Sequence, residues 1–101
     1  MTDAMHAMKS KILGTAMQLA NLHGFGNVTR NMIADKAEIA TGSVSYHFKS
    51  MRKLEAAMVE RAVETRNLKV LGQAIGRKHP VAMKAPDELR QAAVLAIAAV
   101  A

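Results

Sequence analysis

Residues 41–53 place short hydroxylated and ring-bearing side chains directly before a group of cations. The first group comprises Thr41, Ser43, Ser45, Tyr46 and His47, and the second comprises Lys49, Arg52 and Lys53. Short hydroxyl groups donate and accept hydrogen bonds and leave the backbone close to what they contact, whereas ammonium and guanidinium groups bind phosphate. If the first group lies on a helix, its hydroxyl groups suit the base edges of the major groove, and the cations suit the phosphates.

Other kinds of chemistry find little support in the sequence. The chain has no cysteine, which excludes disulfides, thiol catalysis and cysteine-bound zinc. Its four histidines, at positions 6, 23, 47 and 79, lack the spacing of metal ligands, and no nucleophile–base arrangement or phosphate-binding glycine loop is present. We therefore expect no catalytic residue, no metal and no cofactor, and hence no enzyme.

The positive charge permits nucleic acid as a partner. The 101 residues carry a formal net charge of +6. Residues 1–52 hold six Lys and Arg against three Asp and Glu, and residues 53–101 hold eight against five, so each half carries +3. Such an excess attracts polyanions without selecting one.

Neither end of the chain has the pattern of a membrane or export segment. The N-terminal MTDAMHAMKSK lacks an apolar stretch. The longest apolar run, residues 92–101, is well short of the ~20 residues that cross a bilayer. We expect a cytoplasmic protein without membrane contact.

The spacing of apolar residues predicts an all-α fold of five helices. Apolar side chains recur every three or four positions, and HGFG at 23–26 ends the first helix. Thr29 and Thr41 are suitable N-caps for the second and third helices. The predicted helices cover residues 4–23, 29–37, 41–48, 50–76 and 86–101, with a turn at 38–40 and a connection at 77–85.

Two short helices joined by a three-residue turn, with a helix in front and a long one behind, have helix-turn-helix geometry. The segment IADKAEIATGSVSYHFKSMRKL resembles the DNA-binding segment of TetR/AcrR-type repressors, whose pattern is roughly IA-x-x-AGVS-x-G-x-LY-x-HF-x-(S/N)K-x-x-L. The resemblance covers about residues 10–60. The matching positions within the segment are Ile33, Ala34, Ala37, Ile39, Gly42, His47, Phe48, Lys49, Ser50 and Leu54.

The resemblance implies a transcriptional regulator whose partner is double-stranded operator DNA. Carried over by position, the base-contacting residues are Asn31, Thr41, Ser43, Ser45 and Tyr46. The phosphate-contacting residues are Thr29, Arg30, His47, Lys49, Arg52 and Lys53, and Lys9 and Lys11 are expected to flank the site. An asparagine such as Asn31 can pair bidentately with adenine.

The segment also departs from the family pattern. Glu38 stands where the family has the glycine of the turn, and it adds a negative charge near the DNA side. Ser45 replaces the tyrosine of the LY pair, and Ala40 replaces the serine that caps the third helix, which leaves Thr41 as the substitute cap. Only about fifty residues follow the motif, too few to enclose a family-type effector pocket, so no small-molecule ligand is expected.

The second half of the chain is predicted to form a dimer. We divide the chain into a helix-turn-helix DNA-binding region, 1–53, and a helical dimerisation region, 54–101. Residues 92–101 are apolar on every side, so another surface must cover them. The expected interface of a two-fold homodimer, which would bind a palindromic operator, comprises Leu68, Leu71, Ile75, Leu89, Val94, Leu95 and Ile97.

Two other functions remain open from the sequence. The first is a protein-interaction adaptor that kept the fold and lost DNA binding, for which Glu38 and Ser45 would be the traces. The second is an architectural DNA binder without sequence preference. The interpretation favoured over both is a homodimeric repressor without an effector.

Overall fold

The computed structural model describes residues 2–100, which are largely helical with no strand among them. The predicted all-α class is confirmed, although these residues hold seven α-helices where five were predicted. The elements are α1 (Thr2–His23), the short 3-10 helix η1 (Phe25–Asn27), α2 (Arg30–Ala37), α3 (Thr41–His47), α4 (Met51–Glu64), α5 (Leu68–Gly76), α6 (Pro80–Met83) and α7 (Asp87–Val100).

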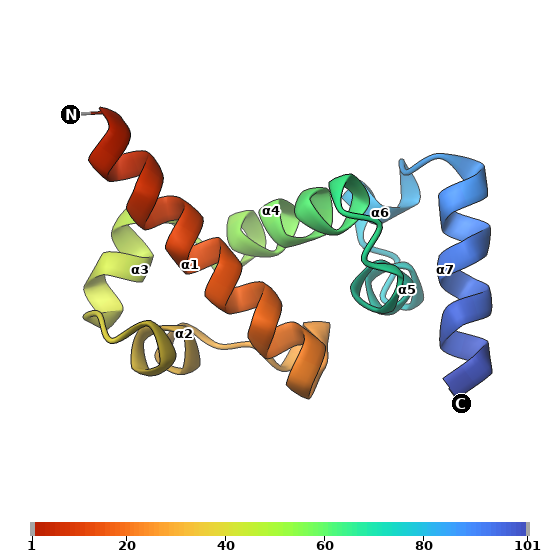
Figure 1. Ribbon diagram of the computed structural model, residues 1–101, viewed down its shortest axis with the longest axis horizontal. Coiled ribbons are helices and arrows are strands. Elements are labelled where there is room, and N and C mark those ends of the chain that lie inside the picture. The colour runs from red at the N-terminus through yellow and green to blue at the C-terminus, as the bar shows by residue number, and fades with distance from the viewer. Residues whose placement is uncertain (1, 101) are drawn as a thin grey trace.

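The helices lie in two groups joined by α4. Figure 1 shows α1, α2 and α3 toward one end of an elongated molecule and α5, α6 and α7 toward the other. The molecule measures 39 × 25 × 18 Å along its principal axes. Since α7 stands at the far end and packs chiefly against α5, its outer face is well separated from α3.

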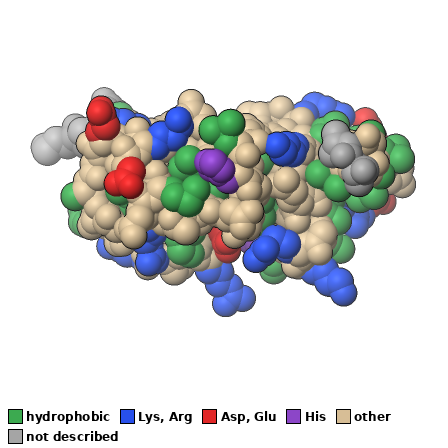
Figure 2. All heavy atoms as spheres, turned by 90° about the horizontal axis from the view of Figure 1, so that it is seen from below, with side chains coloured by type: hydrophobic (Ala, Val, Ile, Leu, Met, Phe, Trp, Pro, Cys, Tyr) green, Lys and Arg blue, Asp and Glu red, His purple; other side chains and the backbone are tan. Residues whose placement is uncertain are grey.

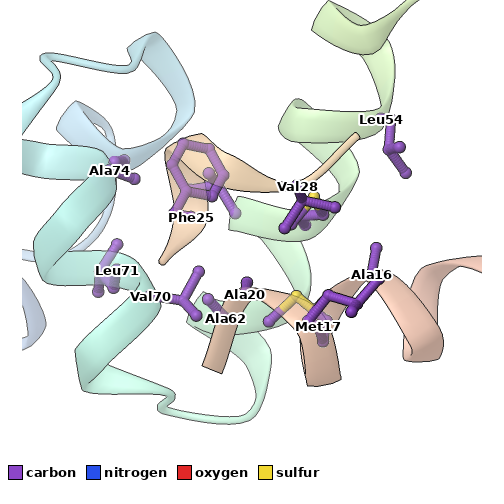
Figure 3. Close-up of a cluster of buried hydrophobic side chains, with 14 of the residues drawn as sticks. Ala16, Met17, Ala20, Phe25, Val28, Leu54, Ala62, Val70, Leu71 and Ala74 are labelled. Carbon is purple, nitrogen blue, oxygen red and sulfur yellow. The ribbon is translucent and has the colours of Figure 1, made fainter. Parts of the chain in front are cut away.

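One aliphatic core continues through both groups of helices. Phe25 of η1 is only 2% exposed, and Figure 3 shows its ring between Val28 and Ala74 of α5. Leu54 and Met58 of α4 are fully buried in the same core. The predicted boundary between residues 53 and 54 falls inside α4. Residues on both sides of it pack into this one core.

Hydrogen bonds also connect the end of α1 with α5. The backbone N–H of Phe25 donates to Oε1 of Gln73 at 2.7 Å. Nδ2 of Asn67 donates to Oδ1 of Asn21 at 3.1 Å. These bonds fix the C-terminal group of helices against the helices that precede it.

The long helix predicted over 50–76 is wrong, because the chain breaks between α4 and α5. The hydroxyl of Thr65 donates to the carbonyl of Arg61 at 2.8 Å, and Arg66 adopts a left-handed φ of 54°. The side chain of Asn67 then accepts from the N–H of Val70 at 3.1 Å and caps α5. An Asn in this position starts a new helix because it satisfies a free amide of the first turn.

The connection predicted over 77–85 contains a further short helix, α6. Nδ1 of His79 accepts from the N–H of Val81 at 3.2 Å, and Pro80 occupies the first helical position. Proline suits this position because its missing N–H would have no partner there.

Three helix ends share one backbone motif with a charged residue in the left-handed position. The residues are Glu38, Arg66 and Lys78, with φ of 58°, 54° and 56°. At each, the residue's own N–H bonds to the carbonyl three positions back, and the next N–H bonds to the carbonyl five back. This is the Schellman motif, in which the left-handed residue is usually glycine.

The close contact of α7 with α5 depends on Gly72. A Cβ at this position would lie 2.3 Å from Cγ1 of Ile97 and 2.8 Å from the carbonyl oxygen of Ala93. Leu71 and Leu89, which were predicted at a dimer interface, are 0% and 4% exposed, so they fill the chain's own core and offer almost no surface to a partner.

Candidate nucleic-acid interface

α2, the following turn and α3 form the helix-turn-helix. The N–H of Met32 donates to the hydroxyl of Thr29 at 3.2 Å, which begins α2 as predicted. Glu38 in its left-handed conformation ends α2, and Ile39 packs against the core. The turn thereby brings α3 alongside α2, with which it makes its main contacts.

α3 has one buried face and one open face. Val44 is fully buried and holds the helix against the core, and Phe48, which follows α3, is 5% exposed. Tyr46 is 59% exposed, Thr41 is also exposed, and Ser43, Ser45 and His47 are half-buried. The predicted base-contacting side chains of α3 therefore include two that are open to a ligand on the outer face.

The cap of α3 differs from the prediction. Ala40 occupies the N-cap position and provides no side-chain bond, so Thr41 is the first helical residue rather than the cap. The hydroxyl of Thr41 instead donates to Oδ1 of Asn31 at 3.3 Å. This bond joins the exposed first turns of α2 and α3. It does not use the Nδ2 group of Asn31.

Cations follow α3 at the start of α4. The hydroxyl of Ser50 accepts from the N–H of Lys53 at 3.1 Å and caps the helix. Lys49, Arg52 and Lys53 are all exposed, and Nζ of Lys49 lies 4.9 Å from the centre of the Tyr46 ring. A cation over an aromatic face is held by the ring's quadrupole, so Tyr46 and Lys49 form one unit.

The remaining predicted phosphate contacts lie around this surface. Thr29 is exposed beside half-buried Arg30 at the start of α2. The rings of His47 and Tyr46 meet edge to face, with centres 5.2 Å apart. Lys9 and Lys11 are both exposed on α1.

The ion pairs between described side chains lie away from this surface. Among residues 6–99 they are Arg66 with Glu88, at 3.8 Å, and Arg90 with Asp87. Figure 2 shows Lys and Arg side chains along the whole length of one face of the molecule, in agreement with the even charge distribution of the sequence. Glu38 is exposed at the turn between α2 and α3.

A surface hollow beside the site was not anticipated from the sequence. It measures about 400 Å³ and is lined by Lys9, His47, Phe48, Lys49, Lys53, Ala56, Ala57 and Glu60. Nζ of Lys9 lies 5.3 Å from the centre of the Phe48 ring. The sequence predicted only that Lys9 flanks the site. Its contact with Phe48 could not be predicted, because it depends on how α1 crosses the end of α3.

A second hollow lies between α5 and α7. It measures about 530 Å³ and is lined by Ile75, Asp87, Arg90, Gln91, Val94 and Leu95. Val94 and Leu95 are 50% and 70% exposed, so the hollow is open to solvent. It differs from the closed pockets that bury most of a small ligand.

Among the side chains that the structure describes, those of residues 6–99, His, Asp and Glu do not gather in groups that could hold a metal ion. None of the helices in residues 2–100 has the length and apolar character needed to span a membrane.

The first part of the chain is similar to a known family of proteins. Residues 12–58 match the family model described as bacterial regulatory proteins, tetR family. The match begins within α1 and ends within α4, so it covers the helix-turn-helix and the cations behind it. Neither the curated proteins nor the solved structures gave a match to the chain.

Proposed function

We propose that the chain is a DNA-binding transcriptional regulator, and that it is a sequence-specific repressor acting as a homodimer on a palindromic operator. The match of residues 12–58 to the tetR family model supports the DNA-binding role. The observation that carries the proposal is the open face of α3, followed by exposed cations at the start of α4. Such a protein is expected to block transcription by occupying the operator, and to act in the cytoplasm, where bacterial DNA lies.

In this proposal α3 enters the major groove. Thr41 and Tyr46 offer exposed hydrogen-bonding groups to base edges, with Ser43 and Ser45 beside them. Asn31 can contribute through both groups of its amide: Nδ2 can donate, and Oδ1, which accepts from Thr41, has a second lone pair. It therefore keeps the groups needed to pair bidentately with adenine.

Phosphate contacts fix the position of α3. Lys49, Arg52 and Lys53 are exposed at one end of α3, and Thr29 and Arg30 lie at the start of α2. Two groups of contacts on either side of a recognition helix set its orientation in the groove, although they carry no sequence information.

Dimerisation through α5 and α7 explains the exposed apolar side chains at the far end. Val94 and Leu95 are solvent-exposed, and half-buried Ile75 lines the same hollow. Leu68 and Ile97 are also half-buried, so they can contribute at the edges of the interface. A two-fold partner would cover this face, and the two copies of α3 would have to lie a whole number of DNA turns apart, about 34 Å or a multiple of it.

We propose that the chain works without a small-molecule effector. The hollow between α5 and α7 is open and is lined by the side chains assigned to the dimer. A second copy seated there would fill it and leave no room for a ligand. Mass spectrometry of the purified dimer under native conditions tests this point, since a retained small molecule would contradict it.

The function is tested by comparing two double variants with equal change in charge. Lys49→Gln with Lys53→Gln removes two proposed phosphate contacts, whereas Lys78→Gln with Lys84→Gln removes two exposed cations of the other group of helices. Fluorescence anisotropy with the duplex upstream of the protein's own gene is the readout. The first variant is expected to lower the slope of log K against log salt by about 2, and the second to leave it unchanged.

Three results would contradict the proposal. Equal loss in both variants would mean that net charge alone drives binding, as for an architectural binder. No binding by the unaltered protein would favour the adaptor, whose working surface would be α7. A footprint without two-fold symmetry, or a monomer in sedimentation at the concentrations that bind DNA, would refute the dimer.

A further inference from the structure

The cleft between α1 and α4 continues the basic surface beyond the helix-turn-helix. Besides the hollow of about 400 Å³ described above, a hollow of about 270 Å³ lies next to it and shares Lys9, Phe48 and Ala57 with it. Figure 1 shows the first half of α1, the end of α3 and the start of α4 meeting at this end of the molecule. We call the two hollows together the α1–α4 cleft.

Cations dominate the polar groups of the cleft. Lys9, Lys49 and Lys53 line the larger hollow, and Glu60 is its acidic residue. Among residues 6–99, whose side chains the structure describes, none of the carboxylates forms an ion pair with these three lysines. Three ammonium groups around a concave surface repel one another, and an anion bound among them would relieve that repulsion.

Lys9 is held in place for such a role by an aromatic ring. Its Nζ lies 5.3 Å from the centre of the Phe48 ring, and Phe48 is only 5% exposed. The aliphatic stem of a lysine can cover apolar surface while its ammonium group stays in water. The buried ring thus orients a cation from α1 toward the cations that follow α3.

We propose that the α1–α4 cleft binds a backbone phosphate of the operator, with Lys9 as a DNA contact contributed by the first helix. The proposal rests on the proposed function and extends its footprint past the start of α4. His47, the last residue of α3, lines the same hollow. Because the phosphates of a duplex border the groove that α3 occupies, the strand beside His47 is the nearest source of phosphate.

The proposal separates Lys9 from Lys11, which the sequence pattern treats alike. Successive residues of an α-helix are rotated by about 100°, so side chains two positions apart point in nearly opposite directions. Lys11 is exposed and lines neither hollow. It is therefore the matched control: the same residue type, on the same helix, outside the cleft.

The experiment measures operator affinity by anisotropy over a range of salt concentrations for Lys9→Gln, Lys11→Gln and Glu60→Gln. Loss of one phosphate contact is expected to lower the salt slope by about 0.9 and to weaken binding at 0.1 M salt by up to about 8-fold. We expect this from Lys9→Gln, no change from Lys11→Gln, and tighter binding from Glu60→Gln. Lys9→Arg should restore the slope, because it keeps the charge.

Two outcomes would overturn the cleft assignment while leaving the proposed function intact. In the first, the unaltered protein binds the operator and Lys9→Gln behaves like Lys11→Gln. In the second, inorganic phosphate at matched ionic strength binds the unaltered protein but not Lys9→Gln and does not compete with the operator, which would assign the cleft to free phosphate. Absence of operator binding by the unaltered protein would refute both proposals together.

Discussion

Glu38, in the turn of the helix-turn-helix, adopts a backbone conformation that is unfavourable for residues with a Cβ. Replacing Glu38 by glycine should therefore stabilise the protein. Glu38 has φ of 58° and ψ of 47°, the left-handed region. Its N–H bonds to the carbonyl of Asp35 at 3.3 Å, and the N–H of Ile39 bonds to the carbonyl of Ala34 at 3.0 Å. The turn needs this conformation because both bonds depend on the chain reversing at residue 38.

The expected gain follows from two opposing terms. The left-handed conformation costs an L-residue with a Cβ roughly 1–2 kcal/mol. Glycine avoids that cost but loses more chain entropy on folding, by roughly 0.5–1 kcal/mol. Glu38→Gly should therefore raise the free energy of unfolding by about 0.5–1 kcal/mol, which for a domain of this size is a rise in Tm of about 2–8 °C.

The assay is equilibrium unfolding in urea, followed by circular dichroism, with two controls. Glu38→Gln keeps the Cβ and removes the charge, so it should leave stability nearly unchanged. Lys78→Gly tests the same backbone motif at the end of α5, where φ is 56°, and should give a similar gain. The stabilisation would then be assigned to backbone conformation rather than to charge.

The two Glu38 variants also separate stability from DNA affinity. Both remove a negative charge from the turn beside α3, so both should bind the operator more tightly than the unaltered protein. A Glu38→Gly protein that is no more stable than Glu38→Gln would refute the conformational reasoning. Equal operator affinity in all three proteins would refute the electrostatic part.

Three further predictions concern packing, capping and readout. Gly72→Ala should destabilise the protein by about 1–3 kcal/mol, because the added Cβ meets α7. Gly76→Ala is the control and should not destabilise it, because no atom beyond its chain neighbours and its own helix backbone lies within 4 Å of the added Cβ there. Urea unfolding measures both, and equal effects would contradict the close contact between α5 and α7. Asn67→Ala should cost about 1 kcal/mol through loss of the α5 cap, and an unchanged midpoint would show that the cap is dispensable. In a double-mutant cycle of operator affinity, Asn31→Ala and Thr41→Ala should couple by about 0.5–3 kcal/mol, and additive losses would show that their hydrogen bond does not matter for binding.

The helix-turn-helix was predictable because its boundaries are encoded by local chemistry. Gly24 has φ of 100°, a conformation open to glycine, and it ends α1 where the pattern HGFG predicted. Thr29 and Ser50 cap α2 and α4 through their own hydroxyl groups. Each of these signals acts within three or four residues, so the sequence alone contains it.

The second half was harder to predict because its helix ends lack the usual signals. Arg66 and Lys78 occupy left-handed positions that glycine commonly fills, and a charged residue in a run of helix formers gives no sign of a break. Asn67 and His79 were available as caps, and Asn67 in particular could have indicated the start of α5. The apolar stripe continued across the break, which made one long helix the simpler interpretation.

Contacts between distant residues could not be predicted from spacing. The bond of Thr41 to Asn31 depends on the path of the turn, and the position of Lys9 over Phe48 depends on how α1 crosses α3. Likewise, Leu71 of α5 and Leu89 of α7 are buried whereas Val94 and Leu95 of α7 are exposed, and only the packing of α5 against α7 decides which apolar side chains become buried.

The most direct test of the account compares the affinity of the unaltered protein for two duplexes of equal length and composition. One is the region upstream of its own gene, the other a scrambled version, and anisotropy is measured at about 50 mM and about 200 mM salt. The account predicts binding that weakens steeply with salt and favours the upstream duplex by about 10³-fold or more. Equal affinity for both duplexes would contradict sequence-specific regulation, and no binding to either at the lower salt would contradict DNA binding itself.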